Sequence, residues 1–142
     1  MKTIRQLLDN KPLKVAAIAP NATVFEALQT MAERDIGALL VMERERLVGI
    51  LSERDYARKV ILQNKSSREI PVSEIMSDKV VAVTLNETVE QCMAVMTEKR
   101  IRHLPVLDGV NVLGVLSIGD LVKEVISEQE FIIKQMSEYI MS

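Results

Sequence analysis

The stretch Leu47-Val-Gly-Ile-Leu-Ser-Glu-Arg-Asp55 returns 65 residues later as Val112-Leu-Gly-Val-Leu-Ser-Ile-Gly-Asp120. In each copy a glycine lies inside a short apolar run of strand character, and a serine and an aspartate follow it three residues apart. The surrounding sequence repeats as well: residues 15–61 align with residues 80–126 without a gap, and 16 of the 47 positions are identical. Self-similarity at a fixed offset indicates two copies of one supersecondary unit.

Each copy contains the same order of expected elements. Thr23 and Thr88 begin capping boxes, and apolar residues at helical spacing follow both of them. Two short strands come next, at 38–42 and 47–51 in the first copy and at 104–107 and 112–116 in the second. A leading strand is expected at 15–18 or 80–83, and a second helix beginning at Ser52 or Ser117 completes a β-α-β-β-α unit.

The fold class that follows is α/β, of the α+β kind, with two units that share one core. A unit of about 60 residues with strands apolar on both faces buries too little surface to be stable alone. We therefore expect the two units to pack sheet to sheet about a pseudo-two-fold axis. The expected organisation is repeat 1 at 3–63, a polar linker at 64–71, repeat 2 at 72–126 and a terminal helix at 127–142.

Composition excludes several classes of protein. The chain has 142 residues, a formal net charge of −2 and no basic excess of the kind that nucleic-acid binding requires. Its apolar runs are far shorter than the roughly 20 residues of a membrane span. One cysteine, Cys92, and one histidine, His103, cannot form a zinc site of Cys/His type, and we expect no metal. The expectation is a cytoplasmic protein that binds neither nucleic acid nor membrane and has no catalytic activity.

The last segment lies outside the repeat. Ser127-Glu-Gln-Glu130 has the pattern of a new capping box, after which Ile133, Met136 and Ile140 fall on one helical face. Such a face either closes the core of its own chain or pairs with a second copy in a homodimer. Both interpretations remain open at this point.

The repeated motif has two interpretations of its own. A serine before a helix and an acid three residues later form a cap that stabilises the helix start by about 1 kcal/mol. A glycine inside a strand, however, often marks the close approach of a backbone or a ligand. A helix N-terminus favours phosphate, and a neighbouring carboxylate is a common acceptor for ribose hydroxyls. The motif is thus either a cap alone or part of a nucleotide site.

The duplicated unit and its Gly-h-x-Ser-x-x-Asp stretches resemble a tandem CBS-domain pair, the Bateman module, over about residues 3–126. The resemblance implies a stand-alone regulatory protein that binds AMP, ADP, ATP, NAD or S-adenosylmethionine in clefts between the repeats. It also implies a homodimer and a possible regulated partner protein. In that family the aspartate holds the ribose diol, the serine approaches phosphate or ribose, and the adenine lies against the leading strand and the stretch that ends in proline.

Carried over to this sequence, the resemblance implies two sites. The first would use Ser52, Arg54, Asp55 and Arg58 together with Val81, Ala82, Arg102, His103 and Pro105. The second would use Ser117 and Asp120 with Ala16, Ala17 and Ala38.

The two copies differ most in charge. Arg102-His103 stands where the first copy has Gly37-Ala38, and Arg54 stands where the second copy has Gly119. Because phosphate recognition favours arginine, with its planar fork of donors, we expect the first site to be the one that binds an anion. The leading hypothesis is a non-catalytic sensor of energy or redox state. The alternative is a scaffold without a ligand, in which both motifs are only helix caps.

Overall fold

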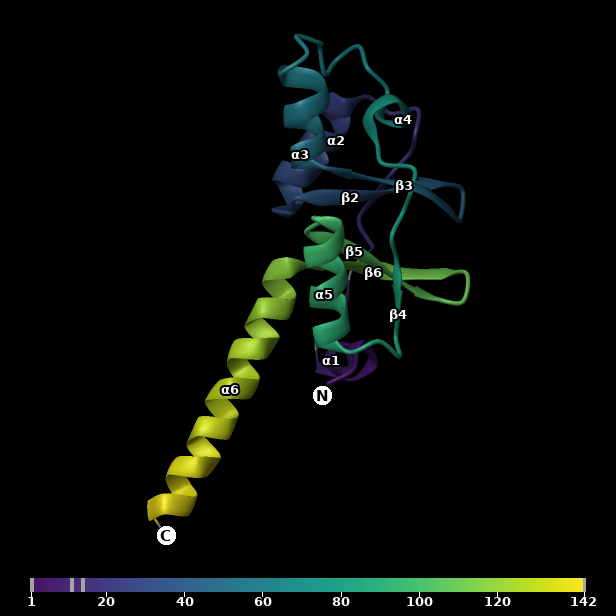
Figure 1. Cartoon of the computed structure of the whole chain (residues 1–142). Helices are drawn as coiled ribbons and strands as arrows, with labels where there is room; N and C mark the ends of the chain where they lie inside the picture. The colour runs from purple at the N-terminus through teal and green to yellow at the C-terminus, as the bar shows by residue number, and fades with distance from the viewer. Residues whose placement is uncertain (1, 11, 14, 142) are drawn as a thin grey trace.

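Two three-stranded sheets, one from each repeat, form the centre of the molecule and face each other (Figure 1). The computed structural model describes residues 2–10, 12–13 and 15–141. The first sheet has the order β1 (Ala17–Ile18), β2 (Ala38–Glu43), β3 (Arg46–Ser52), and the second has the order β4 (Val83–Thr84), β5 (His103–Asp108), β6 (Asn111–Ser117). In each sheet the first pair is parallel and the second antiparallel.

The registers of the two hairpins correspond at an offset of 65 residues. Ala38 pairs with Ser52 as His103 pairs with Ser117, and an irregularity follows Val41 in one sheet as it follows Val106 in the other. The predicted α+β fold of two related units is therefore confirmed. The leading strands are shorter than expected, at two residues each.

The helices begin where the caps predict. Helix α2 (Val24–Arg34) starts with Thr23 Oγ1 accepting from the Glu26 amide at 3.1 Å, and α5 (Val89–Lys99) starts in the same way. The second helix of repeat 1 is α3 (Glu53–Tyr56), which continues into a π-helical turn, η1 (Ala57–Ile61). In repeat 2 the equivalent helix is α6 (Ile118–Met141).

Side chains on the two faces of the middle strands, β2 and β5, are buried in different places. Leu39 and Val41 of β2 belong to the core of repeat 1, and Leu104 and Val106 of β5 belong to the core of repeat 2. Leu40, which is also fully buried, belongs to neither core because successive strand side chains point to opposite faces. Its counterpart Pro105 is buried as well, so these two residues fill the space between the sheets.

Two short helices are exchanged between the repeats. Helix α1 (Ile4–Asn10) places Ile4 and Leu7 in the core of repeat 2, whereas α4 (Val72–Ile75) contributes both of its end residues to the core of repeat 1. The backbone follows the same exchange, since the Ile4 amide donates to Glu87 and the Val72 amide to Ala22, both at 2.8 Å. Each repeat therefore completes its core with a segment that precedes the other one.

The C-terminal segment differs from the sequence prediction of a separate helix at 127–142. No helix starts at Ser127, which lies inside the continuous helix α6, because the apolar spacing of Leu121 and Val125 already belongs to that helix. The interpretation in which this segment closes the core of its own chain is also wrong, since residues 126–141 are all exposed. Ser142 lies outside the described residues.

The glycine in the first motif is required by close packing. A Cβ atom built on Gly49 would lie 2.5 Å from Met76 Sδ and 3.0 Å from the Ser77 carbonyl oxygen. We expect Gly49→Ala to lower the free energy of unfolding by about 1–3 kcal/mol, because the backbone of residue 77 must move. Gly119→Ala is the matched control: in the exposed first turn of α6 its Cβ meets nothing closer than 3.6 Å, and the helix should gain up to about 1 kcal/mol. Equal effects in urea unfolding would contradict this account.

Candidate functional site

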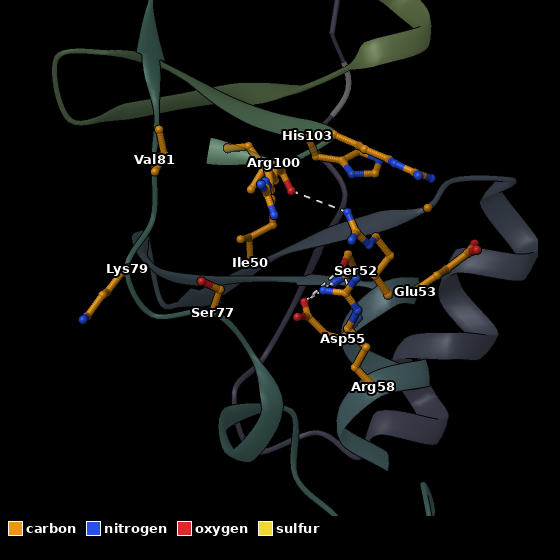
Figure 2. A pocket seen from close by; sticks show the side chains of 14 residues that line it. Ile50, Ser52, Glu53, Asp55, Arg58, Ser77, Lys79, Val81, Arg100 and His103 are labelled. Atoms are coloured by element: carbon orange, nitrogen blue, oxygen red, sulfur yellow. Dashed lines mark hydrogen bonds between the residues drawn. The ribbon is translucent and has the colours of Figure 1, made fainter. Parts of the chain in front are cut away.

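A cavity of about 430 Å³ lies between the two repeats (Figure 2). This volume is within the range of about 300–1,000 Å³ that is usual for small-molecule sites. Fourteen residues line it: Gly37, Ile50, Ser52, Glu53, Arg54, Asp55, Arg58, Ser77, Lys79, Val81, Arg100, Ile101, Arg102 and His103. They come from both repeats.

The first motif forms one side of the cavity. Asp55 Oδ2 accepts hydrogen bonds from the Ser52 amide at 2.9 Å and from Ser52 Oγ at 3.0 Å, and the Asp55 amide donates to Ser52 Oγ at 3.2 Å. The motif is therefore a real capping box at the start of α3. The same arrangement holds at Ser117 and Asp120, with distances of 3.0 and 3.1 Å.

The other carboxylate oxygen of Asp55 points toward a lysine. Lys59 Nζ lies 3.4 Å from Asp55 Oδ1 and donates to the Ile75 carbonyl at 2.9 Å. Lys59 thus ties η1 to α4 and does not line the cavity. Only one oxygen of Asp55 is committed to the cap, so the carboxylate keeps acceptor capacity on the Oδ1 side.

Five cationic side chains line the cavity, against two acidic ones, Glu53 and Asp55. The cations are Arg54, Arg58, Lys79, Arg100 and Arg102. Arg54 Nη1 makes a long contact of 3.5 Å with the Arg100 carbonyl. Within the described part of the chain, the charged groups of the other four form no hydrogen bond or ion pair. The cavity is therefore positive although the whole chain carries a formal charge of −2.

The opposite side of the cavity is held by backbone pairing. The Ile50 amide donates to the Ser77 carbonyl at 3.0 Å, and the Ser77 amide donates to the Ile50 carbonyl at 2.9 Å. This pairing fixes the chain that leaves α4, so that Ser77 and Val81 lie across the cavity from the first motif, while the ammonium group of Lys79 points away from that motif (Figure 2). Ile50, Val81 and Ile101 supply its apolar surface.

His103 lies where the two repeats meet. A Cβ atom on Gly37 of repeat 1 would be 3.5 Å from His103 Nε2, an ordinary van der Waals distance, so the imidazole lies close to the backbone of repeat 1. Burial lowers the pKa of His103 below its ordinary value of 6.5, the carboxylates of Glu53 and Asp120 oppose this shift, and Arg102 adds to it. The imidazole is therefore neutral near pH 7.

Seven of the predicted site residues line this cavity: Ser52, Arg54, Asp55, Arg58, Val81, Arg102 and His103. Two others do not. Pro105 is buried between the sheets, and Ala82 lies half-buried beside Val81. The sequence interpretation missed Gly37, Ile50, Glu53, Ser77, Lys79, Arg100 and Ile101. Arg100 ends α5 in the left-handed conformation, as its counterpart Asp35 ends α2, but Asp35 lines neither cavity, so the repeat did not indicate Arg100.

The residues predicted for a second site are more dispersed. Ser117 and Asp120 cap α6, whereas Ala16 and Ala38 are almost fully buried in repeat 1. Ala17 lines a different, wide cleft of about 1,110 Å³ between the tips of the two hairpins, together with Arg44, Arg46 and Val110.

No group of three His, Cys, Asp or Glu side chains among the described residues is arranged to hold a metal ion. Burial, followed by the Glu87 carboxylate, raises the pKa of Cys92 to about 11, so the thiol stays protonated at neutral pH. Among the helices described, none has the length and apolar character needed to span a bilayer.

Comparison with known proteins identifies the family. The CBS domain family model matches residues 5–62 and 72–127. The chain is 39% identical over 123 residues to the CBS domain-containing protein CBSX3, mitochondrial, of Arabidopsis thaliana. The match covers 83% of this chain, which spans only 60% of the length of that relative.

Solved structures agree with the family match. The CBS domain of NE2398 superposes with a TM-score of 0.84 at 55% identity, covering 88% of this chain and 98% of the other. A putative signal-transduction protein with CBS domains from Burkholderia ambifaria MC40-6 gives a TM-score of 0.86 at 49% identity, covering 90% and 96%. The CBS domain pair of MJ0100 shares the fold, with a TM-score of 0.77 at 24% identity over 90% and 98% of the two chains. The present chain belongs to the CBS-domain family and contains one CBS-domain pair.

The pKa of His103 gives a prediction about pH. Because this pKa is lowered in the folded state, the unfolded chain binds more protons between the folded value and 6.5. The free energy of unfolding should therefore fall as the pH falls below about 6.5, and His103→Gln should show a smaller loss between pH 7.5 and pH 5.5. Urea unfolding at both pH values measures the difference. An identical loss in wild type and variant would show that His103 has no such coupling.

Proposed function

We propose that this CBS-domain pair is a non-catalytic regulatory module that binds one adenine nucleotide, AMP, ADP, ATP or NAD, in the cationic cavity between its repeats. The observation that carries the proposal is a cavity of about 430 Å³ lined by four arginines, Arg54, Arg58, Arg100 and Arg102, of which Arg54 alone makes a side-chain hydrogen bond among the described residues. Cations gathered without protein partners repel one another, so a bound anion would stabilise the arrangement. The crystallised complex of the MJ0100 pair with 5′-methylthioadenosine and S-adenosyl-L-methionine supports an adenosine ligand.

The chemistry of the lining suits the three parts of a nucleotide. Ile50, Val81 and Ile101 offer apolar surface to the adenine ring. Asp55 Oδ1 would accept from a ribose hydroxyl while keeping its 3.4 Å contact with Lys59 Nζ, since Oδ2 already accepts from Ser52. Arg58 lies next to Asp55 at the first motif and would hold a phosphate (Figure 2).

The cap and the ligand site are compatible roles for one motif. The capping box holds the Asp55 side chain in a single orientation before any ligand arrives. A preorganised acceptor loses less conformational entropy on binding. A ligand that contacts both repeats would favour one relative arrangement of them, which could regulate a partner protein or the assembly of the chain.

Isothermal titration calorimetry with AMP, ADP, ATP and NAD tests the proposal. We expect Arg58→Ala to weaken binding of the preferred nucleotide about tenfold or more, because a charge-assisted hydrogen bond to phosphate is lost. Arg34→Ala removes an equal charge from the exposed end of α2 and should leave the affinity unchanged.

Asp55→Asn separates capping from binding. The amide oxygen can still accept from Ser52, but the charged acceptor for ribose is gone, so the affinity should fall about tenfold with little change in Tm. Asp120→Asn makes the same change in the equivalent cap of α6 and should leave the affinity unchanged. The scaffold alternative predicts instead that no nucleotide binds and that the two variants behave alike.

A further inference from the structure

The two repeated motifs differ in the residue that stands four positions after the aspartate. In repeat 1 this residue is Lys59, and in repeat 2 it is Glu124. The caps themselves are closely alike, because the Ser52 and Ser117 amides donate to the aspartate carboxylates at 2.9 and 3.0 Å. The difference between the motifs therefore lies in the side chain one helical turn beyond the aspartate.

Lys59 is held between two groups of repeat 1. Its ammonium group donates to the Ile75 carbonyl at 2.9 Å, at the end of α4, and lies 3.4 Å from Asp55 Oδ1. Lys59 does not line the cavity, so it approaches Asp55 from outside the space for a ligand. Because the Ile75 carbonyl takes one of its three donors, Lys59 is anchored before any ligand binds.

Glu124 has a different partner. Its carboxylate forms an ion pair of 2.6 Å with Lys2 Nζ, next to the start of α1. The same position thus ties each repeat to its exchanged segment, but it brings a cation to the first motif and an acid to the second. The backbone differs here as well, since residues 57–61 form the π-helical turn η1 and residues 122–126 are part of the α-helix α6. Such π-helical turns are frequent at functional sites.

A cation outside the cavity solves a problem that Asp55 creates in an anion site. Arg58 follows Asp55 by three residues, a spacing at which side chains of one helix are neighbours, and both residues line the cavity (Figure 2). Among the described residues no ion pair joins them. Lys59 offsets the charge of the Asp55 carboxylate, so Arg58 stays available for a phosphate. Without Lys59, pairing of Asp55 with Arg58 would remove both groups from the ligand.

We propose that Lys59 is a positioning residue of the nucleotide site, which acts through Asp55 and keeps its carboxylate available to the ribose hydroxyls. The proposal rests on the proposed function and deepens it, because it names the feature that distinguishes the first motif from the second. A merely structural role for Lys59 predicts lower stability in its variants, but the same dependence of affinity on the ribose hydroxyls.

Paired ligands separate these two roles. Calorimetry uses the tightest binder among AMP, ADP, ATP and NAD, and the same compound without the 2′ and 3′ hydroxyls of the adenosine ribose. Wild type should bind the intact compound about tenfold or more tightly than the dideoxy compound, because hydrogen bonds to a carboxylate are lost. In Lys59→Met this ratio should fall to about threefold or less. The ion pair is partly exposed, so the variant should keep its fold, which Tm checks.

Three further variants complete the test. Lys59→Gln keeps a donor for the Ile75 carbonyl without the charge and should show the same reduced ratio, whereas Lys59→Arg should restore the wild-type ratio. Glu124→Met breaks the equivalent ion pair of repeat 2 and should leave the ratio unchanged.

Two failures are distinguishable. If wild type binds a nucleotide and the ratio is the same in Lys59→Met and Lys59→Gln, or falls equally in Glu124→Met, this proposal is overturned and the proposed function stands. If wild type binds none of the four nucleotides, both are overturned.

Discussion

The two backbone hydrogen bonds between Ile50 and Ser77 are the constraint on which the candidate site depends. They join β3 of repeat 1 to the chain that leaves α4, and they require a glycine at position 49 because a Cβ there would strike Met76 and Ser77. Once this segment is fixed, Ser77 and Val81 lie across a cavity from the start of α3. The exchange of α1 and α4 between the cores holds both repeats around that cavity.

The two repeats have similar backbones, but the side chains at equivalent positions differ in charge. Arg100 and Asp35 both end a helix with positive φ, at 56° and 53°, yet one brings a cation to the cavity and the other an acid to the equivalent place. Arg54 is matched by Gly119, and Arg102 by Gly37. Duplication thus supplies two similar frameworks, and divergence of a few side chains makes one side of the interface positive.

The sequence predicted those parts of the structure that local chemistry determines. Capping boxes at Thr23, Ser52, Thr88 and Ser117 and alternation in the hairpins depend on neighbours within a few residues, and they are confirmed. Helices α1 and α4 were not predicted, because Ile4 and Val72 find their packing partners in the distant repeat. Ser77, Lys79 and Arg100 reach the cavity through the same long-range topology. The predicted helix start at Ser127 was wrong because Ser-x-x-Glu can occur inside a helix that begins earlier in the chain, here at Ile118.

The measurement that tests the central claim most directly is a crystal structure of the chain grown with the nucleotide that binds most tightly. The account predicts one nucleotide per chain in the cavity between the repeats, with its phosphate on Arg58 and its ribose within hydrogen-bond distance of Asp55 Oδ1. Nucleotide bound instead between the hairpin tips, or at Ser117 and Asp120 with this cavity empty, would contradict it.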